Sequence, residues 1–499
     1  MATLTVQPST YSGRKLEDTL FQRVPADMRY TGSRYHSYLP VNSLGSGVVD
    51  RITFNLPPFS SATLYDLSSL LVEMTVQIVD QNGNLPHKDV RIANICGAQS
   101  FFSDVKYYLN DVLINPNSGL YHYKHYLKTL MSYPKEYKET VLGLEGYSED
   151  TEHHMQSVDE QNEGFVDRLK NFAKLNNYDN VSEYYADGGH FIFNLAPDLQ
   201  ASIINGVSIR IEITPNQPNV CLFGKKVVPR TDDQNQEGVD PGEHSDHHYL
   251  GVSGYKFLIK NICLHVLCHD LRGEVYEDIE SSLKKQPISL SFRRFDMVPY
   301  TISKGVESYI SDVLFPSSQM VPSRAFFFLV PSDHFTGTQE TNPYDFQLSV
   351  LNANVKRFYV TLGGQDIDGL ISNQNFNKMA FYRLQKVLGL MEGGFTTGIT
   401  YKMFSGGYGI YAIDFSTSLA SCQQYIMPSI RSGHARCTVE FDRVTPSPYH
   451  LLGLFEYPSN ITISIGAQGR VVQVCICLYA YKMRRSCVRL IIARETSRL

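Results

Sequence analysis

Apolar and polar residues alternate along much of the chain, which is the pattern of half-buried β-strands. Residues 102–116, FSDVKYYLNDVLINP, alternate up to Leu109, break at an Asn-Asp pair and then become apolar again. This pattern predicts a β-hairpin with a polar turn. A second segment of the same kind occurs at 355–369, VKRFYVTLGGQDIDG, where Gly363-Gly364 stands at the turn. The chain therefore contains two similar hairpins that lie far apart in sequence.

The similarity between the two halves extends beyond the hairpins. Each hairpin is followed by apolar residues at helical spacing, then by two short strands and a long strand. Alternation alone is common to all-β domains, but one helix in the same slot of both halves favours an internal duplication. The matched segments are, in order, 102–116 with 355–369, 121–131 with 379–390, 190–199 with 410–419, 207–213 with 435–441, and 255–268 with 470–481.

The spacing of strands and turns predicts an all-β chain: two tandem antiparallel jelly-roll sandwiches, a double jelly roll, with short flanking helices. Each half has about eight predicted strands, the number typical of a jelly roll. Ile211 and its alternate neighbours should face a core, since the residues between them are polar. The predicted limits are an N-terminal arm at 1–47, a first jelly roll with long acidic loops at 48–271, a linker at 272–287, a second jelly roll at 288–481 and a basic C-terminal tail at 482–499.

Composition agrees with a large globular chain. With 499 residues, 42% of them hydrophobic and 19% charged, the chain is too long for one core and is not of a disordered class. Its aromatic residues are Tyr and Phe, which suit pleated surfaces. A net charge of −5 and a pI near 6.3 argue against a dedicated nucleic-acid-binding protein. No apolar run approaches the ~20 residues of a membrane span, and the N-terminus has no apolar signal-peptide core.

The nine cysteines are interpreted as buried free thiols. Most of them stand inside apolar strand patterns, as do Cys263, Cys268 and Cys437, which is typical of a reducing compartment. Cys475 and Cys477 would point the same way on a strand, but two thiols alone do not make a metal site.

Charge is unevenly distributed along the chain. Residues 145–187 carry 11 acidic against 3 basic residues, and residues 231–248 carry 6 acidic residues and no Lys or Arg. These inserts flank the consecutive strands 190–195 and 207–213, so antiparallel packing should bring both to one end of the domain. Residues 482–498, in contrast, hold six Lys or Arg and one Glu. Such a tail can lie near a polyanion, and a simply solvated tail is an equal alternative.

Catalytic and cofactor-binding signatures are missing from the sequence in the context they require, so we expect no enzyme activity and no cofactor. GGYG at 406–409 precedes a strand rather than a helix, so it is not a dinucleotide-binding loop. HSDHHY at 244–249 has donors for a divalent ion, but an acidic loop does not fix their geometry. The histidine pair at 153–154 has the same weakness, and His122 and His125 have no third ligand nearby. We therefore expect no metal site.

Several segments resemble a known family of viral proteins. FSDVKYYLNDVLINP, YHYKHYLKTLMSYPKE and FIFNLAPDLQASIINGVSIRIEI are similar to its first half, and RRFDMVPYTISKG and FFFLVPSDHFTGTQETNPYDFQL to its second. The family is the double jelly-roll major capsid proteins of Polinton/Maverick elements and adintovirus-like DNA viruses, with related genes in animal genomes. The resemblance runs in patches from residue 48 to 480 and is most specific at residues 103–105 and 342–346. The acidic inserts and both termini have no counterpart in it.

The resemblance implies a hexon-like major capsid protein. Three copies with two jelly rolls each would form a pseudo-hexagonal homotrimer, and these capsomers would tile an icosahedral shell around double-stranded DNA. It also implies contacts with neighbouring capsomers, penton and minor capsid proteins, a place in the virion, and assembly inside the host cell, in the nucleus. In this family the long loops face outward and the chain ends lie at the inner base. The residues expected to contact the interior or adjacent capsomers, with at most weak, non-specific attraction to packaged DNA, are Lys482, Arg484, Arg485, Arg489 and Arg494.

Two other functions stay open. Jelly rolls also support carbohydrate-binding proteins and enzymes, because fold alone does not fix function. Such a protein would have a concave pocket with converging polar groups. A host gene derived from a capsid gene, with a new role, would share all of the sequence features above.

Overall fold

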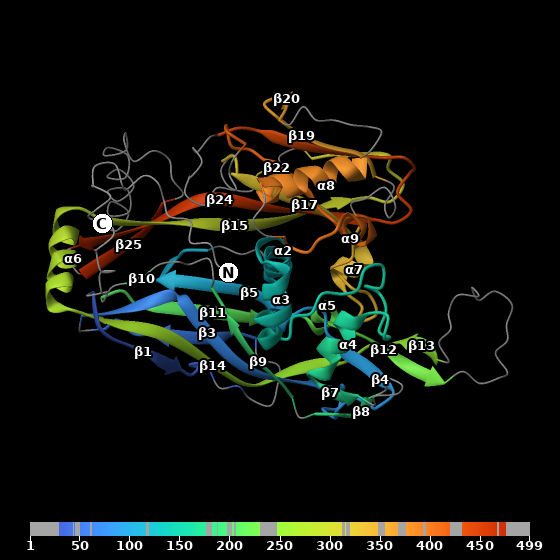
Figure 1. Ribbon diagram of the computed structural model, residues 1–499, viewed down its shortest axis with the longest axis horizontal. Coiled ribbons are helices and arrows are strands. Elements are labelled where there is room, and N and C mark those ends of the chain that lie inside the picture. The colour runs from blue at the N-terminus through green and yellow to red at the C-terminus, as the bar shows by residue number, and fades with distance from the viewer. Residues whose placement is uncertain are drawn as a thin grey trace, which may run out of the picture.

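The strands fall into two sets, one from residues 30–271 and one from residues 288–475, stacked on each other across the long axis of the molecule (Figure 1). Helix α6 (Gly273–Lys285) connects the two sets at one end of that axis. The computed structural model describes residues 29–475 apart from gaps at 43, 45–49, 60–61, 116–118, 176–181, 187, 197–201, 204–205, 230–246, 312–314, 316–319, 348–354, 368–375, 393–395, 420–431 and 467–468.

The first set forms a sandwich of two antiparallel sheets. One sheet has the order β1 (Tyr30–Tyr38), β14 (Lys256–Leu271), β3 (Thr63–Val79), with β9 (Gly189–Asn194) and β10 (Ser202–Ile203) both paired to β3. The other has the order β2 (Ile52–Leu56), β11 (Ile209–Pro215), β5 (Phe102–Leu109), β6 (Val112–Leu113). Ile211 is fully buried between Phe54 and Tyr107, so the predicted facing of its strand is confirmed.

The second set repeats this plan. One sheet has the order β15 (Ile288–Ile302), β24 (Tyr449–Gly466), β17 (Arg324–Pro331), β22 (Tyr411–Asp414), with β25 (Gly469–Cys475) also paired to β24. The other has the order β16 (Ser308–Ile310), β23 (Ala435–Phe441), β19 (Val355–Leu362), β20 (Gln365–Asp366). The two four-stranded sheets therefore have the same strand order, and the chain is a double jelly roll, as predicted.

Three smaller sheets complete the strands described. β13 (His247–Gly251), β12 (Leu222–Pro229) and β4 (Val90–Asn94) extend the first sandwich at the end opposite α6 (Figure 1). The remaining pairs are β7 (Ala173–Leu175) with β8 (Ser182–Tyr185), and β18 (Phe346–Gln347) with β21 (Tyr408–Gly409).

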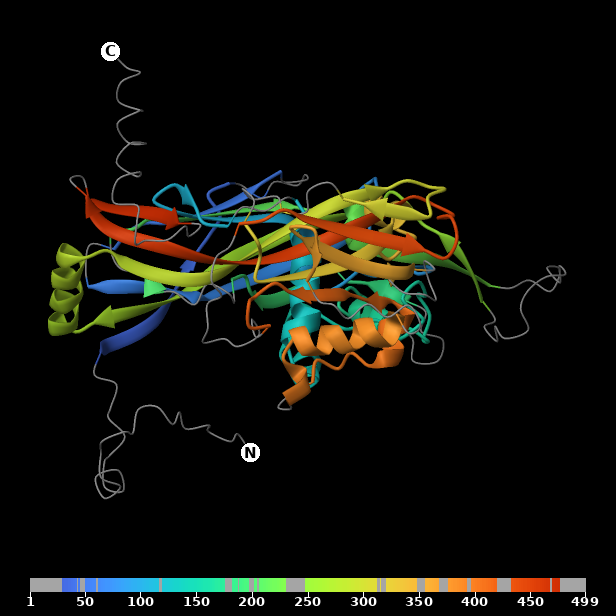
Figure 2. The same cartoon turned by 90° about the horizontal axis from the view of Figure 1, so that it is seen from above.

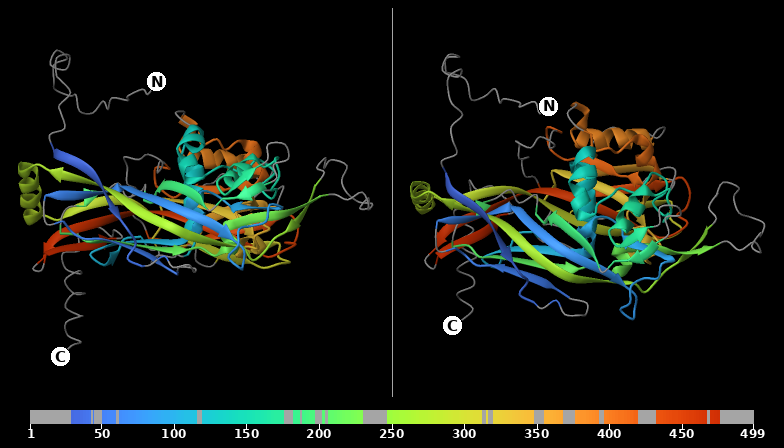
Figure 3. Two further views of the ribbon diagram at one scale, coloured as in Figure 1. Left: turned by 90° about the horizontal axis from the view of Figure 1, so that it is seen from below. Right: turned by 60° about the horizontal axis from the view of Figure 1, so that its bottom comes forward.

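Helices α2 (Tyr121–Ser132) and α8 (Phe376–Val387) follow the two hairpins at the predicted places and project from the same side of the long strands (Figures 2 and 3). The other helices are α3 (Lys135–Thr140), α4 (Glu163–Lys170), α5 (Pro218–Cys221), α7 (Ser332–Thr336) and α9 (Tyr401–Gly406), with 3-10 turns η2 (Ala98–Phe101), η3 (Leu142–Glu145) and η5 (Leu390–Glu392). In the described part of the chain, no helix is both long and apolar enough to cross a bilayer.

Four of the five matched segments occupy equivalent positions, and the fifth match is wrong. The strand equivalent to β14 is β24. In the first sandwich β14 lies between β1 and β3, and β3 also pairs with β9. In the second, β24 lies between β15 and β17, and β17 also pairs with β22. Strand β25, from the segment 470–481, pairs with β24 in a hairpin, and residues 476–481 lie outside the described residues. Two further elements fall in ranges predicted to lie outside the sandwiches: β1 in the N-terminal arm and α6 in the linker.

A single apolar core cluster runs through both sandwiches. It includes Phe54 and Ile211 from the first sandwich and Phe327 and Cys437 from the second, all of them fully buried. The two sandwiches are therefore packed against each other rather than tethered by a linker alone.

Candidate functional site

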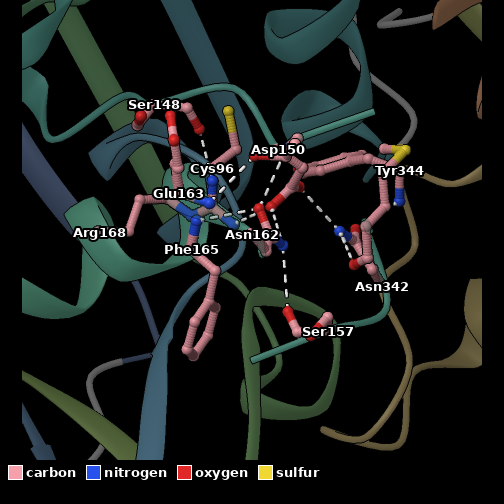
Figure 4. A network of polar contacts seen from close by, with 12 residues as sticks. Cys96, Ser148, Asp150, Ser157, Asn162, Glu163, Phe165, Arg168, Asn342 and Tyr344 are labelled. Carbon is pink, nitrogen blue, oxygen red and sulfur yellow. Dashed lines mark hydrogen bonds and ion pairs between the residues drawn. The ribbon is translucent and has the colours of Figure 1, made fainter. Parts of the chain in front are cut away.

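A buried polar network lies at the junction of the two sandwiches (Figure 4). At its centre is Asp150, whose carboxylate accepts three side-chain hydrogen bonds. Its Oδ1 accepts from Arg168 at 2.6 Å and from Asn162 at 2.8 Å, and its Oδ2 accepts from Asn342 at 2.9 Å. Arg168 and Asn162 belong to the first half of the chain and Asn342 to the second, so one carboxylate ties the halves together.

Helix α4 positions Arg168. Asn162 caps this helix, because its side-chain Oδ1 accepts a hydrogen bond from Phe165 N at 3.2 Å. Arg168 is 1% exposed, and its Nε donates to the carbonyl oxygen of Asn94 on β4 at 3.0 Å. Burial lowers the pKa of Arg168, but the Asp150 carboxylate outweighs burial and the net pKa is raised. The guanidinium therefore stays charged inside the protein.

Asn342 is the second-half anchor of the network. Its backbone N donates to Gln156 Oε1 at 2.9 Å, and its carbonyl oxygen accepts from Gln156 Nε2 at 3.3 Å. Its side-chain Oδ1 accepts from Tyr344 N at 2.9 Å, while its Nδ2 donates to Asp150 and to the carbonyl oxygen of Met155. Because Asn342 is fully buried and all of these groups are paired, its removal would leave several buried groups without partners.

Lys138 on α3 makes a second charged contact across the junction. Its Nζ donates to the carbonyl oxygens of Leu130 and Thr397, each at 2.9 Å, and forms an ion pair with Glu149. Thr397 belongs to the second half. Burial lowers the pKa of Lys138, although Glu149 opposes the shift.

Aromatic rings from α2 supply the apolar part of the junction. The Tyr126 and Tyr344 rings stack with their centroids 4.1 Å apart, and Tyr123 meets Tyr344 edge-on at 5.4 Å. Tyr123 also lies 5.9 Å from Phe328 on β17. Ring pairs at these distances add to the energy of apolar burial. Together with the polar network, they join the two sandwiches across the junction.

Sequence reasoning pointed to the segment 342–346 as specific but assigned it no role, and it missed Asp150 and Arg168. Asp150 is one of 11 acidic residues in its insert, and nothing in the local pattern separates it from solvated neighbours. The capping pattern Asn162-Glu163-Gly164-Phe165 before an amphipathic stretch was the available signal for helix α4.

The histidines considered as metal ligands have different surroundings, none of which is a metal site in the described residues. His122 is 3% exposed, neither of its ring nitrogens has a hydrogen-bond partner in the described chain, and burial lowers its pKa to about 3. His125 Nε2 lies 3.3 Å from Glu145 Oε1, and His153 pairs with a neighbouring glutamate. Residues 244–246 lie outside the described residues. Among those that are described, no group of three or more His, Cys, Asp or Glu side chains could hold a metal ion.

The prediction of free thiols is confirmed for five of the nine cysteines, Cys96, Cys221, Cys263, Cys268 and Cys437. Cys96, Cys221, Cys268 and Cys437 are buried, and Cys263 is partly exposed on β14. Burial raises the pKa of Cys437 to about 11, so its thiol stays protonated at neutral pH. Cys477 lies outside the described residues.

A hydroxyl–imidazole–carboxylate chain on the outer face of the first sandwich was not predicted. Ser37 Oγ lies 2.8 Å from His265 Nδ1, and His265 Nε2 lies 3.2 Å from Glu73 Oε2. This is the order of groups in a serine hydrolase. Here, however, Ser37 and His265 are cross-strand partners in a sheet, where backbone N–H groups serve strand pairing rather than oxyanion binding. We interpret these three side chains as a hydrogen-bond network on the protein surface.

The described part of the first acidic insert lies at the end of the molecule from which the second insert departs. Lys225 on β12 donates to the carbonyl oxygen of Gln156 at 2.9 Å, and Pro229 pairs with His247 where residues 230–246 begin and end. The shared end is as predicted. The first insert is not an open polar loop, however, because it contains α4 and β7 and buries Asp150.

The structure does not place the predicted basic contact residues. Lys482, Arg484, Arg485, Arg489 and Arg494 all lie outside the described residues, which end at 475. Their role therefore stays a prediction.

Comparison with known proteins gives one relative in sequence. Uncharacterized protein F54H12.2 of Caenorhabditis elegans is 24% identical over 404 residues, which cover 78% of this chain and 85% of that protein. No protein-family model matches the chain.

Solved structures with a similar fold come from viruses. A chain in the cryo-EM structure of the Sputnik virophage is 12% identical, with a TM-score of 0.59 over 99% of this chain and 98% of that chain. The Faustovirus major capsid protein is 10% identical, with a TM-score of 0.49 over 90% of this chain and 94% of that chain. The mavirus major capsid protein is 11% identical, with a TM-score of 0.46 over 96% of each chain. At these identities the likeness to the Sputnik chain establishes the shared fold.

Proposed function

We propose that the chain is a hexon-like major capsid protein of a double-stranded DNA virus. Three copies would associate into a pseudo-hexagonal homotrimer, and these capsomers would tile an icosahedral shell together with penton and minor capsid proteins. The mature location would be the virion, after assembly in the host nucleus. The resemblance to Polinton/Maverick and adintovirus-like capsid proteins supports this lineage.

The duplicated sandwich is the observation that carries the proposal. The sheets β2-β11-β5-β6 and β16-β23-β19-β20 share one strand order, so each chain presents two similar blocks side by side. Three chains then present six such blocks, which is the number a hexagonal tile needs. The buried Asp150–Arg168–Asn342 network supports the proposal, since tiling requires the two blocks to keep a fixed relative orientation.

We further propose that the acidic end faces outward and the basic tail faces the genome or an adjacent capsomer. The first insert and the strands that flank the second lie at the end opposite α6, which agrees with outward-facing loops (Figure 1). The salt dependence of DNA binding is the slope of the logarithm of the binding constant against the logarithm of the salt concentration. Replacement of the five basic tail residues by glutamine should reduce the size of this slope by at most about 4.5. An unchanged slope would exclude the tail from DNA contact.

A second candidate is a host protein derived from such a capsid gene. The Caenorhabditis elegans relative favours it, since that protein is encoded by an animal and its alignment covers most of both chains. A genomic locus that also encodes a packaging ATPase and a protease would favour a virus or an intact element, and an isolated locus the host gene.

The experiment that tests the capsid proposal is the size and shape of the purified protein. Light scattering after gel filtration should give three times the chain mass of 56.5 kDa. Negative-stain images should show hexagonal outlines, and the subunit contacts should bury well above ~2,000 Å² in total. A stable monomer at micromolar concentration would contradict the proposal.

A deletion between β12 and β13 separates assembly from outward display. Removal of residues 232–246 leaves the β12–β13 pairing at Pro229 and His247 in place and should leave trimers intact, because this stretch of the sequence is polar and acidic and has almost no apolar residues to contribute to a core. Loss of trimers on this deletion would mean that the acidic insert holds subunits together.

A further inference from the structure

A small basic cavity lies at the junction, between helix α2 of the first half and strand β15 of the second. Its volume is about 50 Å³, which accommodates a few water molecules or one compact ion. Among the residues that the structure describes, its lining has four Lys or Arg side chains and no Asp or Glu. The four are Lys124, Lys128, Arg293 and Arg294.

Three of these side chains are accessible to a solute. Lys124 and Lys128 are partly exposed and stand four residues apart, so they share one face of α2. Lys128 Nζ lies 5.4 Å from the centre of the Phe295 ring, which holds this ammonium group beside β15. Arg293 is on the same face of β15 as Phe295, and its side chain is 22% exposed.

Nearby carboxylates offset only part of the positive charge. Glu456 is shared by Arg293 and Arg324, with both N–O contacts at 2.6 Å. Asp296 pairs with Arg294, which is 3% exposed and therefore adds charge to the cavity rather than a direct contact with a ligand. Arg293 and the two lysines are thus the side chains that a ligand would meet.

The charges named around the cavity do not balance. A third carboxylate, Glu145, pairs with His125, which also lines the cavity. Five Lys or Arg side chains then face three carboxylates, an excess of two positive charges. The cations come from both halves of the chain and repel one another, and like charges four residues apart also disfavour a helix. An anion between them would replace repulsion with attraction and would contact both sandwiches at once.

We propose that this cavity binds a compact phosphate-type anion that bridges the two sandwiches. Lys124 and Lys128 of α2 would contact its oxygens from one side, and Arg293 of β15 from the other, through charge-assisted hydrogen bonds. A free inorganic anion and the diphosphate of a nucleotide share this chemistry. The site goes beyond capsid assembly and does not depend on it.

The test is calorimetric titration of the full-length protein with sodium pyrophosphate. A magnesium-free buffer with about 0.15 M sodium chloride screens general surface attraction. Pyrophosphate should bind with a dissociation constant below about 1 mM, and no binding in this range would overturn the proposal. Titration with ADP identifies the source: tighter binding than pyrophosphate supports a nucleotide, and equal or weaker binding supports an inorganic anion.

Matched variants of α2 locate the site. Lys124→Gln and Lys128→Gln should each weaken pyrophosphate binding at least about fivefold, since each removes a charge-assisted contact. The control is Lys386→Gln, which removes an exposed lysine from the equivalent helix α8, outside the cavity, with the same change in net charge. It should bind pyrophosphate as the native protein does. Equal weakening in all three variants would indicate general attraction to positive charge and would overturn the site.

A variant of β15 tests the bridge between the halves. Arg293→Gln should also weaken pyrophosphate binding at least about fivefold, while Glu456 keeps Arg324 as its partner. A melting temperature close to that of the native protein, measured without pyrophosphate, will show that each variant folds. Unchanged binding by folded Arg293→Gln would overturn the bridge.

Discussion

The two sandwiches share a framework but reach it with different residues. Both hairpins turn through two residues with positive φ: Asn110 at 45° and Asp111 at 63° in the first, Gly363 at 60° and Gly364 at 85° in the second. Both angles positive is the geometry of the two-residue turn that suits twisted strands. The duplication therefore preserves backbone geometry where residue identity has changed.

The difference between the sandwiches lies in what surrounds the framework. The first has α2 facing the junction, with Tyr123 and Tyr126 buried, and an insert that supplies Asp150 and Arg168. The helix of the second, α8, packs on its own strand β22 and leaves Tyr382 43% exposed. The first sandwich thus supplies a helix and an insert to the junction, and the second supplies the segments that they contact. Similar blocks can therefore have unlike roles in one chain.

A charge placed in the core of either sandwich is expected to have the largest effect on stability. Ile211 on β11 and Cys437 on β23 occupy equivalent buried positions opposite β5 and β19. Ile211→Lys and Cys437→Lys should each destabilise the fold by more than about 4 kcal/mol, because an unpaired charge is buried. Soluble expression and urea unfolding measure this, with exposed Arg436→Lys as control. Folded Ile211→Lys protein would refute the facing of β11.

Removal of the Asp150 carboxylate from the junction is expected to have the second largest effect on stability. Asp150→Asn keeps the shape of the side chain but leaves Arg168 without its anionic partner, and should cost about 3–5 kcal/mol. Guanidinium unfolding followed by circular dichroism and tyrosine fluorescence measures the loss. The control is Asp167→Asn, which breaks an exposed pair with Lys170 and should cost at most about 1 kcal/mol. An unchanged midpoint for Asp150→Asn would show that the Asp150 carboxylate is not needed to hold the junction together.

Acidification should lower the free energy of unfolding through His122, which is buried at the junction. Burial lowers the pKa of His122 to about 3 in the folded protein, whereas the unfolded chain has a histidine pKa of about 6.5. The unfolded state therefore binds more protons between these values, and stability falls as pH drops through that window. Between pH 7 and 5 the native protein should lose about 2 kcal/mol more than His122→Phe. Urea unfolding at both pH values decides this, and equal losses would contradict burial of a neutral imidazole.

The hairpin turns should give the smallest effect. An added Cβ at Gly364 meets no atom within 4 Å, so Gly364→Ala costs only the strain of positive φ, about 1 kcal/mol. At the equivalent position, Asp111→Gly should stabilise by about 0.5 kcal/mol. Gly143→Ala is the control, since its φ is not positive and its Cβ is also free of contacts. Thermal unfolding measures all three, and equal stability of Gly364→Ala and the native protein would exclude strain at the turn.

Alternation, turns and one helix per half were sufficient to predict the double jelly roll, because these features depend on near neighbours in sequence. The mistaken pairing of 255–268 with 470–481 has a specific cause. The true counterpart, β24, contains Pro458, which is unusual inside a central strand. It is tolerated because β17 pairs with β24 up to Glu456 and β25 pairs from Asn460, so Pro458 lies between these two partners.

The junction was beyond a single-sequence interpretation for a different reason. Asp150 and Asn342 are 192 residues apart, and their contact depends on how the two sandwiches stack. Acidic residues in a polar stretch are normally solvated. Burial of Asp150 is decided by Arg168, which approaches from a helix that only the folded insert positions.

The same separation sets an order of events during synthesis. The ribosome completes Asp150, Asn162 and Arg168 long before Asn342 emerges, so the first sandwich can close its ion pair while one carboxylate oxygen still faces water. The second sandwich then docks onto a finished surface. A nascent chain that ends before Asn342 would thus leave Asp150 Oδ2 without the hydrogen bond that it accepts from that side chain.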